Sequence, residues 1–276
     1  MEIFYSYLNS ILLGFIQAVT EFLPISSSGH LIIFRDLTKT QFSYGLAFDS
    51  VLQLATTLSV VVYFRKDICR LIKSGLLMLR GKLEDKSDKV MILGIMIGTI
   101  PAVILGLLLE NFMDTIFRNS LLVAGTLVLG SLVMYMADKF SREDREITIK
   151  NSLIIGFFQS LALIPGMSRS GMTISGGLLL GLKREVAIRF SFLLAIPVLL
   201  GSGIKKMIDL GSGGLLESVG GELVVGSVIA FFIGIFVIRF LITYLKNNSF
   251  KLFIYYRLIL ASLIIFIYFL NYYKIL

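Results

Sequence analysis

Two short segments of this chain combine hydroxyl, glycine and ionisable side chains within otherwise apolar sequence. Residues 17–30 read Gln-x3-Glu-Phe-Leu-Pro-Ile-Ser-Ser-Ser-Gly-His, and residues 165–173 read Pro-Gly-Met-Ser-Arg-Ser-Gly-Met-Thr. Polar groups at membrane depth are costly, so they mark candidate functional sites. If the two segments meet, they supply an anion site, a nucleophile, a base and a carboxylate. Phosphoryl transfer needs such groups, because its catalysis depends on positioning and charge stabilisation.

Each group has a chemical reason for its candidacy. Arg169 carries a planar, permanent positive charge suited to bidentate phosphate contact. His30, the only histidine, has an ordinary pKa suited to acid–base work. Glu21 can hold Mg²⁺ or Ca²⁺, or orient His30. Helices beginning just after Ser28 and Ser170 would point free N–H groups at an anion. The remaining candidates are hydroxyls that donate or attack and glycines that admit a ligand: Ser26, Ser27, Ser168, Thr173, Gly29, Gly166 and Gly171.

Every one of these residues also has a structural interpretation. A serine run after a proline is typical of a helix cap or turn. His30 can lie among the outer headgroups, and Arg169 can snorkel or simply pair with Glu21. The functional hypothesis therefore depends on the convergence of the groups. Gln17 lies one turn before Glu21 on the same helix face and is a further substrate-binding candidate, although it can also hydrogen-bond between helices. Gln159 is interpreted as hydrogen-bonding between helices, and Asp49 and Gln53 are interpreted as packing or capping residues.

The composition predicts an all-α polytopic integral membrane protein with a single membrane domain over residues 1–276. The chain is 56% hydrophobic, with a mean hydropathy of +0.88, whereas soluble domains are about 45–50% apolar. A β-barrel would show short alternating segments instead. The net charge of +8 comes from Lys and Arg in loops between apolar stretches, as the positive-inside rule expects, so no nucleic-acid partner is predicted.

The apolar pattern predicts about six full spans and two broken helices. Residues 4–35 break at Pro24 into an apolar helix, 4–23, and a piece at 29–35 that is too short to cross a bilayer. Residues 151–182 break at Pro165 into two short pieces, 151–164 and 171–182. We interpret both as re-entrant helix–break–helix hairpins, whose irregular backbone must face protein or a water-filled cavity. The basic loop 65–89 is placed in the cytoplasm. The predicted full spans are 46–64, 90–109, 119–137, 190–207, 222–243 and 252–272.

An internal repeat relates the two broken helices. Shifting the chain by 142 residues places Gln17 on Gln159 and Gly29 on Gly171. Ser26 and Ser28 fall in the same way on Ser168 and Ser170. The copies are residues 9–64 and 151–207, with three predicted spans between their hairpins, so the second copy is expected to be inverted. Inverted repeats with broken helices are typical of transporters, whose sites lie where the repeats meet. The parity argument fails if residues 4–23 cross the membrane once.

The two segments resemble the signatures of the undecaprenyl-diphosphate phosphatases, also called the bacitracin-resistance family. The length, the span pattern and the segment Phe48-Asp-x3-Gln53 fit as well. Carried over by position, Glu21, Ser27, His30 and Arg169 match the residues that the family is thought to use in catalysis. Gln17 stands where the family often has glutamate, which puts a metal-binding role at this position in doubt. The resemblance leaves open whether Ser27, His30 or water is the nucleophile.

The resemblance implies hydrolysis of undecaprenyl diphosphate to undecaprenyl phosphate and inorganic phosphate. This reaction recycles the lipid carrier of cell-wall synthesis and confers bacitracin resistance. A divalent cation, Mg²⁺ or Ca²⁺, is implied, as is a multi-pass location in the bacterial cell membrane with the site facing the outer side. The expected partners are the polyprenyl lipid and membrane lipid, and a homodimer is the oligomer considered. The alternative is a transporter or flippase of polyprenyl phosphate. Phosphatidic-acid-type chemistry is excluded, because it needs two histidines.

Overall fold

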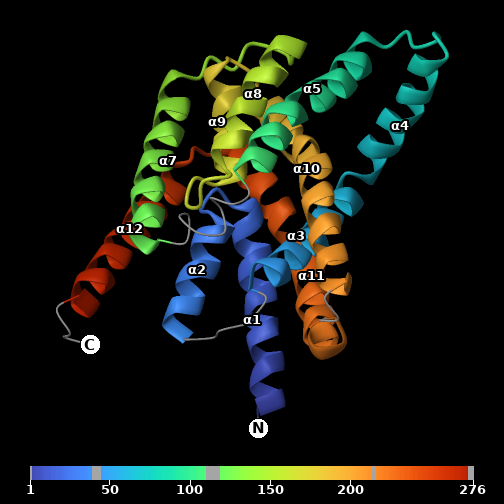
Figure 1. Cartoon of the computed structure of the whole chain (residues 1–276). Helices are drawn as coiled ribbons and strands as arrows, with labels where there is room; N and C mark the ends of the chain where they lie inside the picture. The colour runs from blue at the N-terminus through green and yellow to red at the C-terminus, as the bar shows by residue number, and fades with distance from the viewer. Residues whose placement is uncertain (1, 39–44, 110–118, 213–215, 273–276) are drawn as a thin grey trace.

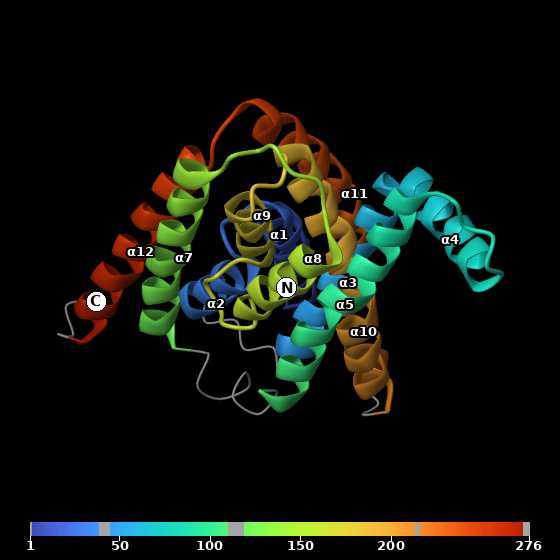
Figure 2. The ribbon, with the colours of Figure 1, turned by 90° about the horizontal axis from the view of Figure 1, so that it is seen from above.

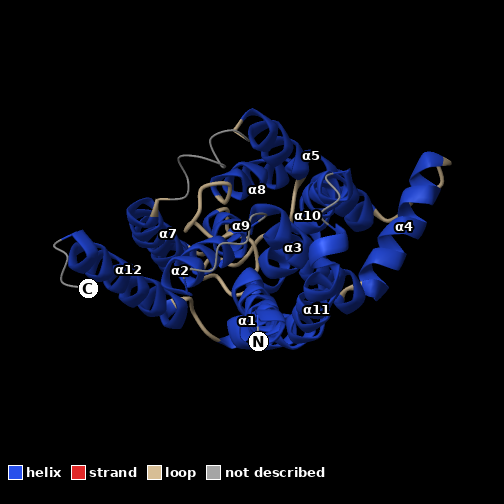
Figure 3. Cartoon of the chain, turned by 60° about the horizontal axis from the view of Figure 1, so that its bottom comes forward, coloured by secondary structure: helices blue, strands red, loops and turns tan. Residues whose placement is uncertain are grey.

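The computed structural model describes residues 2–38, 45–109, 119–212 and 216–272. These ranges contain helices, turns and one isolated bridge between Arg145 and Leu182, with no strand (Figure 3), which confirms the all-α class. The helices are α1 (Glu2–Phe22), α2 (Ser27–Thr38), α3 (Gly45–Tyr63), α4 (Arg65–Leu79), α5 (Lys86–Leu108), α7 (Ser120–Phe140), α8 (Ile149–Leu161), α9 (Arg169–Leu179), α10 (Arg184–Ser212), α11 (Leu216–Asn247) and α12 (Lys251–Tyr272).

Five of the described helices are long and apolar enough to cross a membrane. They lie in α5, α7, α10, α11 and α12 and match five of the six predicted spans. The sixth prediction, 46–64, falls on α3, whose apolar part is the shorter stretch Phe48–Tyr63. The basic loop at 65–89 is largely helical, since α4 occupies it. A helix forms there because Ile68 and Leu71 pack on the hydrophobic core while the basic side chains face outward.

Two helix pairs occupy the centre of the molecule. Figure 1 shows α1 rising from the N-terminal end to mid-height, where the chain turns back into α2. The pair α8 and α9 enters from the opposite end, and its turn reaches the same height. Seen from above, α7 and α12 lie on one side of these pairs, and α5, α10 and α11 lie on the other (Figure 2). The turns of both pairs are therefore enclosed by protein, as irregular backbone in a membrane requires.

Glycines let each pair approach a long helix closely. A methyl group on Gly14 of α1 would overlap the carbonyl oxygen of Gly226 on α11, and one on Gly156 of α8 would overlap that of Gly98 on α5. Small residues are common where membrane helices cross. In lipid the hydrophobic effect does not drive helices together, so van der Waals contact between close backbones stabilises the pair. These two crossings fix the depth of the central turns.

We predict that Gly156→Ala destabilises the protein. The new methyl group must displace the backbone of α5, and overpacking of this kind costs about 1–3 kcal/mol. The matched control is Gly125→Ala on α7, where an added Cβ meets no atom within 4 Å. The control should be neutral or slightly stabilising, because alanine favours helix over glycine. Thermal unfolding in detergent measures both, and equal midpoints would contradict the close packing of α8 on α5.

Candidate functional site

The turns of the two central pairs have the same backbone geometry. Each ends at a serine with left-handed backbone, Ser26 with φ 77° and Ser168 with φ 72°. Ser26 Oγ accepts the N–H of Gly29 at 3.3 Å, and Ser168 Oγ accepts that of Gly171 at 3.3 Å. Left-handed backbone is strained for a residue with a Cβ and persists where the surroundings impose it. These serines cap α2 and α9, which therefore begin two residues earlier than the sequence predicted.

The two turns are in direct contact. The backbone N–H of Gly166 donates to Ser26 Oγ at 3.1 Å, so one serine caps its own helix and also anchors the other turn. A side chain on Gly166 would overlap Thr126, and its φ is +93°, so only glycine fits this approach. The polar residues of residues 17–30 and 165–173 are thereby brought to one place, as the sequence predicted.

Glu21 is the centre of this arrangement. Its side chain is 3% exposed, and Oε1 accepts a hydrogen bond from Arg169 Nη2 at 3.0 Å. Oε2 accepts from Ser27 Oγ at 2.8 Å, from Gln17 Nε2 at 3.0 Å and from Gln53 Nε2 at 3.4 Å. One buried carboxylate therefore joins both turns and α3. Such a carboxylate needs several donors, because a buried charge is costly unless it is paired and hydrogen-bonded.

A cavity of about 100 Å³ opens beside Glu21. In the described part of the chain, Nε and Nη1 of Arg169 are buried and have no hydrogen-bond partner. The guanidinium thus uses one nitrogen on Glu21 and leaves two nitrogens without a partner, and Arg169 is one of the residues that line the cavity. A buried donor without a partner costs about 1–3 kcal/mol, which an anion at this position would recover. The lining residues are Thr20, Glu21, Ser26, Ser27, Ser28, Gln53, Ala162, Ser168 and Arg169.

The remaining predicted residues surround the cavity without lining it. Gln17 lies behind Glu21 as a donor to it. Ser170 Oγ lies 3.3 Å from Ser168 Oγ, and Thr173 donates to the carbonyl of Arg169. Gly29, Gly166 and Gly171 contribute backbone only. The interpretation of Gln53 as a packing or capping residue was wrong, because this side chain lines the cavity and bonds Glu21.

His30 faces away from the cavity. Its Nδ1 lies 2.7 Å from the carbonyl oxygen of Ser26, and its Nε2 lies 2.7 Å from the hydroxyl of Tyr256 on α12. A carbonyl only accepts, so Nδ1 carries the hydrogen and Nε2 of the neutral ring accepts from Tyr256. The two rings are nearly parallel, with an interplanar angle of 8°. In this arrangement His30 holds the backbone of the strained serine.

Arg257, which is not among the residues predicted from the sequence, is fully buried in α12. Its guanidinium donates to the carbonyl oxygens of both turns, and no carboxylate is among its partners in the described residues. The signal was an arginine inside the predicted span 252–272, since a charge within an apolar span is costly and needs an explanation. Its acceptors are the carbonyls of Pro24, Thr126, Leu127, Gly166 and Met167 and the hydroxyl of Ser131.

The site holds one carboxylate for a cation. Within the described ranges no group of three or more His, Cys, Asp or Glu side chains comes together. A protein-only cage is therefore not formed there. Mg²⁺ usually keeps waters and uses one or two carboxylates together with substrate phosphates. Glu21 and a bound phosphate fit that donor set.

Comparison with known proteins gives one consistent result. The sequence profile of the bacitracin resistance protein BacA matches residues 10–263. Undecaprenyl-diphosphatase of Thermobifida fusca is 43% identical over 265 residues, which cover 94% of this chain and 89% of the relative. The proteins of the same name from Mycolicibacterium smegmatis and Moorella thermoacetica are 42% and 40% identical. The two alignments cover 94% and 96% of this chain, and they cover 96% and 98% of the respective relatives.

We predict that Arg257→Met strongly lowers the thermal unfolding midpoint in detergent. The substitution leaves carbonyls of both turns without a donor, at about 1–3 kcal/mol for each one unpaired. Arg257→Lys should recover part of the loss, because it keeps the charge with fewer donors. Arg239→Met on α11, an exposed position, is the matched control and should change little. An Arg257→Met protein as stable as the wild type would show that the guanidinium does not hold the turns.

Proposed function

The chain belongs to the bacitracin resistance protein BacA family, and on that premise we propose that its cavity binds the diphosphate of undecaprenyl diphosphate. The protein is a multi-pass membrane enzyme that hydrolyses this lipid to undecaprenyl phosphate and inorganic phosphate. The observation that carries the assignment is the guanidinium of Arg169, of which Nη2 bonds Glu21 while Nε and Nη1 have no partner among the described residues. Arg169 lines the cavity, so an anion bound there would supply these two nitrogens with acceptors that the described residues lack.

Substrate binding frees the carboxylate beside the nucleophile. In the structure Arg169 is held by Glu21, whose other oxygen accepts from Ser27 Oγ at 2.8 Å. A diphosphate competes with Glu21 for the guanidinium, because it carries more charge and more acceptors. As Arg169 turns to the phosphate, Glu21 keeps Ser27 as its donor and becomes the acceptor for the hydroxyl proton. Positioning and charge stabilisation then supply most of the catalysis.

The reaction proceeds in two displacements. Ser27 Oγ attacks the terminal phosphorus while Glu21 takes its proton, and the bond to the bridging oxygen breaks. Undecaprenyl phosphate leaves with that oxygen, and the terminal phosphoryl group remains on Ser27. Water then hydrolyses the phosphoserine, releases inorganic phosphate and restores the hydroxyl. Ser26, Ser28 and Ser168 line the same cavity and donate to phosphate oxygens.

His30 contributes through the first turn. Its bond to the Ser26 carbonyl holds the left-handed residue that immediately precedes Ser27. We assign it a positioning role in the state described by the structure. The general acid–base role expected from the sequence stays a prediction, and it requires the ring to leave Tyr256.

A divalent cation, Mg²⁺ or Ca²⁺, completes the proposal. Glu21 would hold it together with the substrate oxygens, since these supply the ligands that the described residues lack. When bound, such an ion neutralises charge that develops on the phosphate oxygens. The protein's own part is to present Glu21 and Arg169 side by side at the cavity.

The arrangement of the substrate follows from the fold. We propose that the two central pairs are the re-entrant hairpins of an inverted repeat. The matching caps of Ser26 and Ser168 support this relation. The polyprenyl tail would leave the cavity between spans, and the site would open to the outer side of the bacterial cell membrane. The homodimer and the lack of nucleic-acid partners stay predictions.

We predict that Arg169→Ala lowers phosphate release from undecaprenyl diphosphate by about 10²–10³-fold, as expected when a charge-stabilising donor is lost. The rate of phosphate release by Arg169→Lys should lie between those of the wild type and Arg169→Ala, because an ammonium keeps the charge but cannot contact two phosphate oxygens in one plane. Arg239→Lys, at an exposed position on α11, is the control.

EDTA should abolish release and Mg²⁺ or Ca²⁺ should restore it. A wild type that stays inert with metal would contradict the hydrolase, and translocation in vesicles would then test the flippase alternative.

We predict that Ser27 becomes phosphorylated during turnover. Substrate labelled in its terminal phosphate is mixed with enzyme and quenched in acid within one turnover, and protein-bound label is counted. Wild type should retain label, while Ser27→Ala should retain none. Ser28→Ala, in the same cavity, should still be labelled. Label on Ser27→Ala, or release at the wild-type rate by that variant, would assign the attack to water or to another residue.

A further inference from the structure

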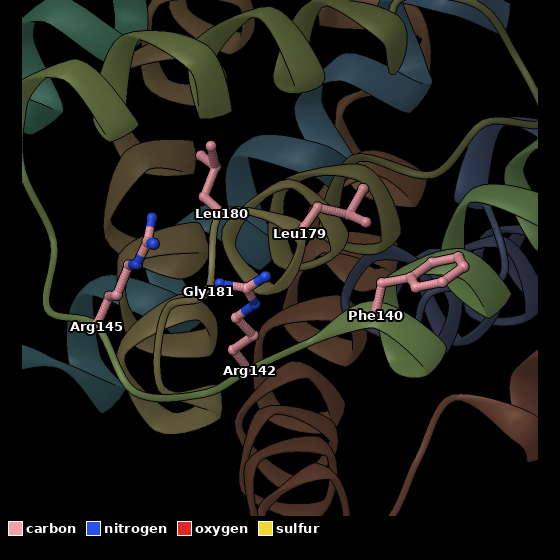
Figure 4. A pocket seen from close by; sticks show the side chains of 6 residues that line it. All are labelled: Phe140, Arg142, Arg145, Leu179, Leu180 and Gly181. Atoms are coloured by element: carbon pink, nitrogen blue, oxygen red, sulfur yellow. The ribbon is translucent and has the colours of Figure 1, made fainter.

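A second cavity, of about 210 Å³, lies far from the catalytic residues. It is at the end of the molecule opposite the N-terminus, where α7 and α9 end (Figure 1). Figure 4 shows its lining, with the side chains of Arg142 and Arg145 directed toward Leu179 and Leu180. Phe140 and Gly181 complete it. The hydrolysis described above uses none of these residues.

Backbone hydrogen bonds make this cavity a defined structure. The N–H groups of Asp144 and Arg145 donate to the carbonyl of Gly181 at 3.1 and 2.9 Å, and the N–H of Lys183 donates to the carbonyl of Arg145 at 3.0 Å. Gly181 has φ +83°, and a Cβ there would lie 3.2 Å from Arg145 Cδ. The segment between α7 and α8 is thus held on the turn between α9 and α10, and the arginines are presented by a fixed backbone.

The acidic side chains nearby are already neutralised by other cations. Arg184 forms ion pairs with Asp138 and Glu143, each at 3.0 Å. Lys183 bonds Glu146 at 2.6 Å, and this hydrogen bond raises the pKa of the lysine. None of these three carboxylates therefore pairs with Arg142 or Arg145, the two arginines of the cavity.

The arginines themselves are almost unpaired. Arg142 forms no hydrogen bond or ion pair with any residue that the structure describes. Arg145 has one contact, 3.9 Å to Asp144, and both side chains are more than half exposed. A pair so long and so exposed contributes little. The C-terminal ends of α7 and α9 point here with about half a negative charge each, which two whole positive charges outweigh. The cavity thus favours an anion.

The apolar side of the cavity continues along a membrane helix. Phe140 is 57% exposed and ends α7, a helix long enough to span the bilayer. Met136 and Leu132 precede Phe140 by four and eight residues, so they lie on the same face of α7, and both side chains are exposed. The cavity therefore lies where the apolar span gives way to polar loops. An anion with an attached hydrocarbon chain would satisfy the arginines and this stripe together.

We propose that this cavity binds the phosphate headgroup of an anionic phospholipid, with one acyl chain along Phe140, Met136 and Leu132. Arg142 and Arg145 contact the phosphate, and Leu179 and Leu180 contact the glycerol region. The proposal stands independently of the catalytic mechanism.

The test uses the whole chain in nanodiscs of phosphatidylcholine with or without added phosphatidylglycerol, followed by native mass spectrometry of the retained lipid. The test variant is Arg142→Gln with Arg145→Gln. The matched control is Arg80→Gln with Lys82→Gln, which removes the same charge from exposed positions between α4 and α5. Thermal unfolding with each lipid is the second measurement.

Wild type and control should retain phosphatidylglycerol and unfold at a higher temperature with it. The test variant should retain at least about tenfold less, because it loses the charged hydrogen bonds of both guanidinium groups to the phosphate. Normal hydrolysis by the variant would show that it is folded. Equal retention by all three proteins, or equal loss in the control, would overturn the proposal. Stabilisation by inorganic phosphate equal to that by the lipid would also overturn it, because the ligand would then be the free anion.

Discussion

Backbone carbonyls freed by broken helices impose the main constraint on this structure. Each central pair turns within the protein, so carbonyls of the turn residues have no helical partners and no ready access to water. Arg257 meets this need with one guanidinium that donates to Pro24 in the first turn and to Gly166 and Met167 in the second. A buried cation is itself costly. Here several carbonyl dipoles stabilise the positive charge of Arg257. These interactions offset the cost of burying it, and they require both turns. The guanidinium and the two turns therefore depend on each other.

The catalytic geometry follows from this junction. Once the turns are fixed, Ser26 can accept the N–H of Gly166, and Arg169 can reach Glu21. The resting site is then nearly neutral, because Glu21 and Arg169 compensate each other while two guanidinium nitrogens stay free. An enzyme for a lipid diphosphate needs this balance. A bare arginine at this depth would be expensive, whereas a fully paired one would have no donors left for substrate.

The sequence predicted the parts of the site that depend on local chemistry. Serine and glycine spacing around Ser26 and Ser168 predicted two capped helix starts, and the repeat predicted that they meet. Orientation about a helix axis was not predictable in the same way. His30 turns toward Tyr256 and not toward the cavity, because its partner lies on α12 and is invisible to local pattern. Gln53 was misjudged for the same reason, since its bond to Glu21 depends on how α3 crosses α1. Arg257 could have been found, because a charge in an apolar run requires an explanation.

The two turns share a backbone conformation but carry different residues directly after the left-handed serine, and that difference makes the site chemically useful. Ser27 and Arg169 are the first residues of α2 and α9, each directly after a left-handed serine, and they bind opposite oxygens of Glu21. Two arginines here would repel each other and leave no hydroxyl to attack. Two serines would leave the carboxylate and the phosphate without a cation. One residue of each kind gives a nucleophile on one side of Glu21 and an anion anchor on the other. Equivalent scaffolds carrying unlike side chains thus provide both functions of a phosphoryl-transfer site.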